Sequence, residues 1–217
     1  MNCVIIKNAY QGIVVADPST GTKLTLNETI IDNAYDAGLL GINTSINARN
    51  LLVSNCGKNI LLVNGGNYNF THCTAATFSN SYIQHKDPVL AVTNYLNGSA
   101  NNLNAVFRNC IFWAEANGLV NDEVLVLKQG STAFNVTFDQ VLWRVQNNPT
   151  NSTINGAINN QNPMFDTINT SQKIYSYRLR TGSPAVDKGT NTAVNIDLDG
   201  NPRPVGTKPD LGAYEKQ

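Results

Sequence analysis

Short runs of alternating apolar and polar residues follow one another along this chain, and each run ends in a small or polar turn. The clearest run is 105–112, in which neighbouring side chains of an extended strand point to opposite sides. Its pattern of two apolar positions followed by a polar one recurs, with the polar position at Asn8, Asn33, Asn55, His72, Asn109 and Gln140. The steps are 25, 22, 17, 37 and 31 residues. A period of about 22 residues with insertions predicts a solenoid.

A coil of this length cannot bury its own apolar side, so the coils must stack with their strands in parallel to share one core. Stacking would place the polar positions in a single column, where amide side chains bond from coil to coil. His72 replaces Asn in this column, and we therefore assign it a structural role. Residues 146–161 are polar and rich in Asn, and we expect them to be irregular.

Composition narrows the choice of partners. The chain has 217 residues, 14% of them charged, and no net charge, which argues against a nucleic acid or an anionic membrane as partner. No apolar run reaches the roughly 18 residues of a membrane span. Cys56, Cys73 and Cys110 each follow a polar position of the repeat. We expect buried free thiols in one column, with a disulfide between neighbouring coils as the open alternative.

The coil pattern resembles the right-handed parallel β-helix of the pectate-lyase-like superfamily. The end of the chain resembles the C-terminal segment of bacterial choice-of-anchor Q domain proteins, which are common in Bacteroidetes. The motifs that carry this second resemblance are Asn162-Pro163-Met164-Phe165, Tyr177-Arg178-Leu179, Ser183-Pro184-Ala185-Val186-Asp187-Lys188-Gly189, Asp197-Leu198-Asp199-Gly200-Asn201-Pro202-Arg203-Pro204 and Asp210-Leu211-Gly212-Ala213-Tyr214-Glu215.

The two resemblances imply an all-β fold: a right-handed parallel β-helix of about six coils over residues 1–161. An irregular segment, 162–217, would close its C-terminal end as part of the same structural domain. They also imply an exported or cell-surface bacterial protein. Because this chain carries neither an export signal nor the family's surface anchor, we expect it to be the C-terminal part of a longer protein.

Two charge pairs are expected on the outside of the repeated strand, Lys7 with Asp32 and Arg108 with Asp139. Exposed pairs of this kind contribute about 0–1 kcal/mol. Polysaccharide lyases with the resembled fold place a basic residue and calcium-binding acids on a strand face. Arg108 and Asp139 are therefore candidate catalytic residues, with a solvated face carrying ion pairs as the alternative.

A second outward column contains Ile5, Ile30 and Leu52. Three adjacent apolar residues outside the core predict a cover, which would be a loop, further N-terminal coils or another chain. These residues are the candidate interface.

Further candidates lie in the insertions. His85 and Asp87 belong to the longest insertion, after residue 78, and His with Asp can serve as an acid–base pair. The alternative is a polar loop before Pro88. Alternation along the strand places Trp113 outside the core, where it could stack on a sugar ring with Tyr82 or Tyr95.

Asp197 and Asp199 alternate before Gly200, as at the start of calcium loops. The Glu that ends such a loop in EF-hands is missing, so the alternative is a closing turn in which Asp199 or Asp210 receives Arg203. Calcium is the only cofactor that the sequence suggests.

Two classes of function remain open. The first is a non-catalytic surface module for adhesion, scaffolding or glycan binding, with a polysaccharide or a surface protein as partner. The second is a polysaccharide-degrading enzyme, a lyase or a glycoside hydrolase, with its site on the outer strand face. The neutral, Asn-rich composition and the lack of a sharp acid–base motif favour the first.

Overall fold

The computed structural model describes residues 1–78, 82–115 and 119–217, and every regular element within them is a β-strand. The strands are β1 (Ile5–Lys7), β2 (Gln11–Ala16), β3 (Leu24–Asp32), β4 (Ala37–Ser54), β5 (Lys58–Thr71), β6 (Thr74–Thr77), β7 (Leu90–Thr93), β8 (Tyr95–Leu96), β9 (Ser99–Ala100), β10 (Leu103–Ala114), β11 (Val124–Leu127), β12 (Phe134–Trp143), β13 (Thr153–Asn159), β14 (Phe165–Asn169) and β15 (Ile174–Leu179). The predicted all-β class is confirmed. These described ranges contain no helix with the length and apolar character needed to cross a membrane.

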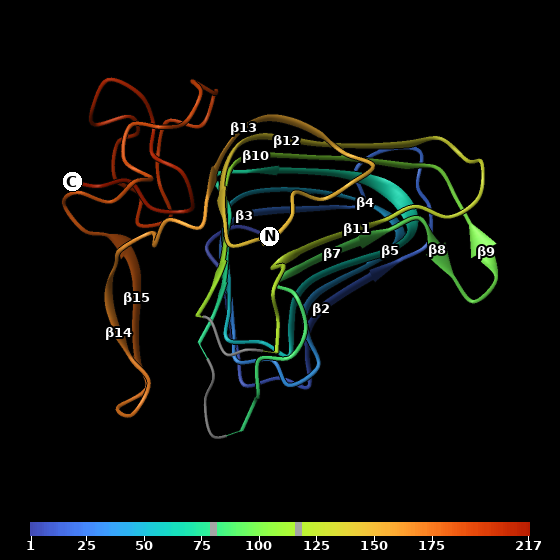
Figure 1. Ribbon diagram of the computed structural model, residues 1–217, viewed down its shortest axis with the longest axis horizontal. Helices are drawn as coiled ribbons and strands as arrows, with labels where there is room; N and C mark the ends of the chain where they lie inside the picture. Colours follow the sequence, from blue (N-terminus) through green and yellow to red (C-terminus); the bar gives the residue numbers. More distant parts are fainter. Residues whose placement is uncertain (79–81, 116–118) are drawn as a thin grey trace.

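Strands one period apart pair in parallel, and the pairs wind into a parallel β-helix (Figure 1). Long strands such as β4 and β10 bend at corners, so each contributes to more than one side of the stack. We number three faces. Face 1 contains 24–27, 44–49, 66–71, 103–108, 134–139 and 153–155. Face 2 contains β1, 29–32, 51–54, β6, 111–114, 141–143 and 157–159. Face 3 contains β2, 37–42, 58–62, β7 and β11.

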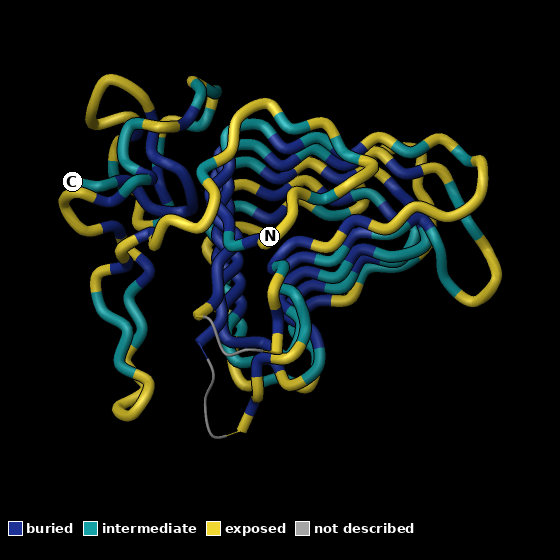
Figure 2. The backbone as a smooth tube through the Cα atoms, viewed as in Figure 1, coloured by how far each residue is buried: buried dark blue, intermediate teal, exposed yellow. Residues whose placement is uncertain are grey.

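The core consists of inward side chains stacked level upon level. Phe70, Phe107 and Phe138 share one register on face 1, and their rings stack at centroid distances of 5.3 and 5.2 Å. Trp143 packs edge-on against Phe138. All four side chains belong to the buried core, and Figure 2 shows that buried positions recur at matching places on successive levels of the stack. Burial of one ring above another explains why the coil-to-coil period is kept across insertions.

The chain turns between faces through residues with a left-handed backbone. The corner from face 1 to face 2 contains Glu28, Asn50, His72, Asn109 and Gln140, all with φ between 46° and 55°. The corner from face 2 to face 3 contains Asn8, Asn33 and Asn55, with φ between 52° and 58°. Asn tolerates this conformation better than most residues because its short amide bonds locally, which accounts for the abundance of Asn at turns.

The predicted single column of polar residues is therefore wrong, and two columns exist. The corners of one coil lie five residues apart, as Asn50 and Asn55 show, and both carry the same kind of residue. The repeated polar position lies at the second corner up to Asn55 and at the first corner from His72 onward. This change of corner explains the short step of 17 residues. Amides do bond along each column, since Asn33 donates to Asn8 at 2.7 Å and Asn50 to Glu28 at 3.1 Å.

The predicted single column of cysteines is also wrong, because the cysteines follow two different corners. Cys73 and Cys110 follow the first corner and lie on neighbouring levels, whereas Cys56 follows the second corner. All three are buried and free. Burial raises the pKa of Cys56 to about 12 and that of Cys110 well above its ordinary value, so both remain neutral thiols within the core.

Residues 146–161 are not irregular throughout, as the sequence suggested. Strand β13 forms within them and pairs in parallel with β12, so that Ile154 lies beside Phe138 and Ile158 beside Leu142. Its pattern is short and interrupted by Gly156, which takes the corner position opposite Gln140 with φ 100°. The stack continues one level further than the apolar pattern indicated.

Residues 162–217 lie along the outside of face 2 and do not close the end of the stack, contrary to expectation (Figure 1). Their antiparallel hairpin β14–β15 and the loops after it contact successive levels. Asn50 donates to the carbonyl of Ile196 at 2.9 Å, the N–H of Ala213 donates to Thr74 at 3.0 Å, and that of Thr190 donates to Asn109 at 2.9 Å. We call residues 162–217 the lateral segment.

The lateral segment is the cover that the apolar column of face 2 predicted. Ile5, Ile30 and Leu52 share one register, but their exposure differs. Leu52 is buried in an outer apolar cluster with Leu211 and Ala213, and Ile30 packs at its edge. Ile5 is 64% exposed. The cover comes from this chain itself and ends before the first level.

Candidate functional site

A cavity of about 390 Å³ opens where face 2, its second corner and the lateral segment meet. We call it the corner cleft. Its lining comes from β1 and β3 with the residues that follow them, from the corner after β4, from the chain after β6, and from the β14–β15 hairpin. The lining residues are Lys7, Asn8, Asp32, Asn33, Asn55, Tyr82, Lys173 and Tyr175. The volume falls in the range of about 300–1,000 Å³ typical of small-molecule sites.

The amide pair at the corner presents one donor and one acceptor to the cleft. Asn33 Nδ2 donates to Asn8 Oδ1 at 2.7 Å. Among the described residues, Asn8 Nδ2 and Asn33 Oδ1 have no further protein partner. A ligand with adjacent hydroxyl groups can donate to one of these atoms and accept from the other.

The acidic group of the cleft is already bonded. Asp32 Oδ1 accepts from Ser54 at 2.7 Å and from Asn55 at 3.2 Å, while Oδ2 lies 3.8 Å from Lys7 Nζ. The predicted pair of Lys7 with Asp32 is present. With these partners, Asp32 holds the corner together and compensates part of the positive charge of Lys7.

Two tyrosines line the opposite side. Tyr82 is 72% exposed, and the ammonium group of Lys173 lies 4.6 Å from its ring centroid. The hydroxyl of Tyr175 is buried and has no hydrogen-bond partner among the described residues. Burial and the nearby charge of Asp32 raise the pKa of Tyr175, so it is a neutral hydroxyl able to donate or accept.

An exposed aromatic pair continues the corner beyond the amides. Tyr10 and Tyr35 follow Asn8 and Asn33 by two residues and stack at 5.9 Å with an interplanar angle of 26°. They are 69% and 62% exposed. Exposed tyrosines in register with an amide pair offer stacking surfaces beside hydrogen-bonding groups.

The three aromatic residues predicted as a platform do not gather. Tyr82 lines the corner cleft. Trp113 does point away from the inner core, as alternation predicted, but it is only 8% exposed and belongs to the outer apolar cluster. Tyr95 lies in the small β8–β9 hairpin, away from the lateral segment in Figure 1. Tyr175 and Lys173 were missed, because nothing in the local sequence shows that the hairpin folds back to the first coils.

Arg108 and Asp139 form the predicted ion pair on the outside of face 1, with Nε 2.7 Å from Oδ2. The side chains are 43% and 18% exposed. This pair lies on face 1, whereas the Lys7–Asp32 pair lies on face 2. The sequence predicted one column for both pairs because its repeat pattern does not distinguish the two corners. The Nε–H of Arg108 is engaged by the Asp139 carboxylate, so neither group of the pair is left without a partner on this face.

Of the two alternatives for this insertion, the acid–base pair of His85 with Asp87 is not formed among the described residues, where His85 contacts Glu123 instead. It is buried, and its Nε2 donates to Glu123 Oε1 at 2.9 Å. Arg144 donates to the same carboxylate oxygen, and the N–H of Val89 donates to Oε2 at 3.3 Å. Glu123, which sequence reasoning missed, is thus the centre of a buried cluster that fixes the end of this insertion; residues 79–81 of the insertion lie outside the described part.

Asp197 closes a turn instead of opening a calcium loop. Its Oδ1 accepts the N–H groups of Asp199 and Asn201 at 2.9 and 2.8 Å, and Oδ2 accepts that of Glu215 at 3.1 Å. Asp199 binds Arg178 through both oxygens, at 2.6 and 2.7 Å. Within the described residues no group of three or more His, Cys, Asp or Glu side chains is placed to hold a metal ion.

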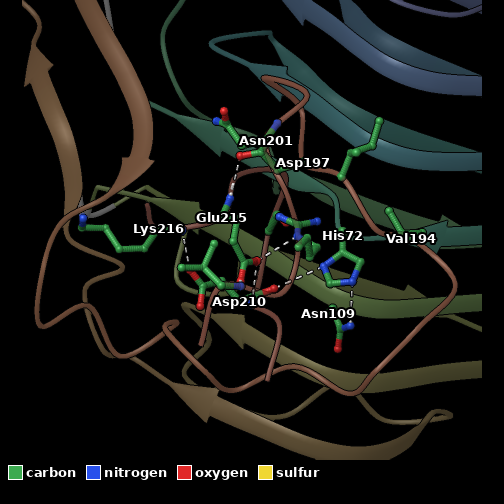
Figure 3. A network of polar contacts seen from close by, with 12 residues as sticks. His72, Asn109, Val194, Asp197, Asn201, Asp210, Glu215 and Lys216 are labelled. Atoms are coloured by element: carbon green, nitrogen blue, oxygen red, sulfur yellow. Dashed lines mark hydrogen bonds and ion pairs between the residues drawn. The ribbon is translucent and has the colours of Figure 1, made fainter. Parts of the chain in front are cut away.

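The partner predicted for Arg203 is also wrong, because it binds neither Asp199 nor Asp210. Its Nε lies 2.9 Å from Glu215 Oε2, and its other nitrogens donate to Asn50 Oδ1 at 2.9 Å and to the carbonyl of Gly212 at 3.0 Å. Both charged side chains are fully buried. This pair belongs to a polar network that ties the lateral segment to the first corner. Figure 3 shows the part of this network around Glu215, Asp210 and His72.

His72 belongs to this network and has the structural role predicted for it. Its Nδ1 lies 3.2 Å from the carbonyl oxygen of Asp210 and must donate to it, so Nε2 accepts from Asn109 at 3.0 Å and from Thr192 at 3.2 Å (Figure 3). Burial and the charge of Arg203 lower its pKa to about 2. A neutral ring with both nitrogens bonded has no free atom for acid–base chemistry.

Comparison with known proteins gives a distant likeness in structure and none in sequence. No family model and no curated protein matches the chain. Among solved structures, it is similar to a crystal structure of pectate lyase Pel9A, with 15% sequence identity and a TM-score of 0.37 over 98% of this chain and 70% of that chain.

Proposed function

We propose that this protein is an exported, cell-surface module built on a right-handed parallel β-helix of about six coils, and that it binds a carbohydrate without modifying it. The proposal extends to kinship with the choice-of-anchor Q proteins, on the motifs of the lateral segment quoted above. Adhesion or scaffolding at a bacterial surface would then follow from glycan binding by a rigid stack.

The observation that carries the proposal is the exposed corner where tyrosines and amides stand in register. Tyr10 and Tyr35 stack at 5.9 Å with most of their surface in water, next to the bonded amides of Asn8 and Asn33. Sugars combine apolar ring faces with hydroxyl groups, so they are recognised by aromatic rings that have hydrogen-bonding groups beside them. The candidate catalytic residue His85 and the candidate calcium ligand Asp197 are instead engaged in buried structural bonds.

The test is affinity electrophoresis of the whole chain through gels that contain soluble neutral or acidic polysaccharides. We expect retardation by at least one polysaccharide and no shortening of the polymer. Replacement of both Tyr10 and Tyr35 by Ala should weaken the retardation. Tyr95→Ala is the matched control and should leave it unchanged. If no polysaccharide retards the protein, carbohydrate binding is wrong.

A second candidate is a polysaccharide-degrading enzyme that uses Arg108 and Asp139. The partly exposed position of this pair on a strand face favours it, while the short bond to Asp139 argues against a basic role for Arg108. Ultraviolet-absorbing unsaturated products, or new reducing ends, that disappear in Arg108→Ala would establish this alternative and replace the first.

The side of the first level that bears Ile5 is a candidate contact for a preceding coil or another chain. Ile5 is 64% exposed, while Ile30 and Leu52 beside it are covered progressively by the lateral segment. Ile5→Lys should weaken such a contact without unfolding the stack, and an unchanged association state at every protein concentration would argue against it.

A further inference from the structure

We infer that the corner cleft is a saccharide-binding pocket that accepts one or two sugar units. Tyr82 would stack on a sugar ring, and the Asn8–Asn33 pair would form hydrogen bonds with its hydroxyl groups. The inference rests on the proposed function and adds to it a particular pocket and a ligand chemistry. The exposed corner of Tyr10 and Tyr35 offers a surface to a glycan chain, whereas the cleft encloses part of a ligand.

The first argument is that the cleft is a built site, made of segments far apart in the chain. Asn8, Asn33 and Asn55 come from three successive levels of the second corner. Lys173 and Tyr175 come from the β14–β15 hairpin, which reaches this corner only because the lateral segment lies along face 2. The position of the hairpin is fixed by the buried Tyr177, whose hydroxyl donates to Asn55 Oδ1 at 3.1 Å.

The second argument is the match between the polar atoms of the cleft and a pair of neighbouring hydroxyl groups. Asn8 Nδ2 can donate and Asn33 Oδ1 can accept, and neither has another protein partner among the described residues. The buried hydroxyl of Tyr175, which also lines the cleft, has no hydrogen-bond partner among the described residues. A buried polar group without a partner is costly, so a ligand hydroxyl that bonds to Tyr175 is favoured over an apolar ligand.

The third argument is charge. Asp32 is bonded to Ser54, Asn55 and Lys7, so it offers little to a metal ion. Lys7 is offset by Asp32, and the ammonium group of Lys173 lies over the ring of Tyr82. A doubly charged phosphate prefers several uncompensated cations, which the cleft does not provide. The balance fits a hydroxyl-rich ligand, either neutral or with a single carboxylate near Lys173.

The experiment is saturation-transfer NMR on the whole chain with two sets of probes, neutral hexose trisaccharides and trisaccharides of hexuronic acids. We expect saturation of ring protons in at least one set. Tyr82→Ala should weaken the affinity about tenfold or more, as loss of a central aromatic anchor does, and Asn33→Ala should weaken it in the same direction. Tyr95→Ala is the matched control. Thermal unfolding of each variant checks that the fold is intact.

The outcomes separate the two proposals. Saccharide binding that Tyr82→Ala and Asn33→Ala leave intact, but that the Tyr10→Ala, Tyr35→Ala pair removes, would overturn the pocket and leave the proposed function standing. No saturation with either set, together with no retardation by polysaccharides, would overturn both. If only the acidic set binds, and the Lys173→Gln variant loses that binding, the pocket stands and its ligand is a uronic acid.

Discussion

At the scale of single residues, Phe107 shows how much of the fold depends on one stacked ring. It is fully buried between Phe70 and Phe138 and packs edge-on against Phe112. Phe107→Ala should lower the free energy of unfolding by about 3–5 kcal/mol, because neighbouring levels cannot close the cavity. Denaturant unfolding measures this. Val106→Ala, on the outward side of the same strand, should cost much less, and equal losses would contradict the assigned inward and outward sides.

His72 and Asp210 should give opposite dependences of stability on pH. Burial and Arg203 lower the His72 pKa from 6.5 to about 2, so below about pH 6.5 the unfolded chain takes up a proton that the folded chain does not, and stability falls. Burial raises the pKa of Asp210 from 3.8 to about 6. Here the folded chain binds the proton more readily, and acidification between these values adds stability.

Two variants separate these effects. His72→Asn fits a corner where Asn50 and Asn109 already occur, and it should reduce the loss of thermal stability between about pH 7 and pH 4. Asp210→Asn removes the opposing contribution and should make that loss steeper. Thermal midpoints measured across this range check both variants. Parallel profiles for the wild type and both variants would show that neither group controls the acid response.

At the scale of elements, the first corner is held by backbone conformation and by contacts with the lateral segment. Asn109 has φ 55° and bonds to Thr190 through both amide atoms, at 2.8 and 2.9 Å. Asn109→Gly loses the two bonds to Thr190, but glycine adopts the left-handed backbone conformation without strain. Asn109→Ala loses the same bonds and is also strained in this conformation. The Ala variant should therefore be less stable than the Gly variant by about 1–2 kcal/mol, measured by denaturant unfolding. A Gly variant as unstable as the Ala variant would contradict this account.

The elements also show what local pattern can and cannot predict. Alternation predicted the strands and the parallel stack, because side-chain burial on one side repeats within each coil. The two corners were merged because Asn50 and Asn55 offer the same local chemistry to either turn. The pairing of His85 with Glu123, and the approach of Tyr175 to Asp32, depend on segments that meet only in the folded chain, and no spacing in the sequence encodes them.

At the scale of the whole molecule, the buried pair of Arg203 and Glu215 holds the lateral segment against the stack. Arg203→Met leaves a buried carboxylate without its partner and should cost about 3–5 kcal/mol. Adding Glu215→Gln removes the unpaired charge and should recover part of the loss. Denaturant unfolding measures the stability of both variants. Binding of a hydrophobic dye reports whether the lateral segment has left face 2 and exposed its apolar residues. A double variant no more stable than Arg203→Met would show that charge burial is not the cause.

The position of the lateral segment also determines how the stack would respond to a force applied at the C-terminal end of the chain. A simple stack pulled from one end would unzip one coil at a time, because each level is bonded only to its neighbours. Here the lateral segment is bonded to Asn50, Thr74 and Asn109, on three successive levels, through Ile196, Ala213 and Thr190 respectively. Tension applied at the C-terminus would therefore be shared among three levels, so the lateral segment should leave face 2 only when its bonds to all of them break together.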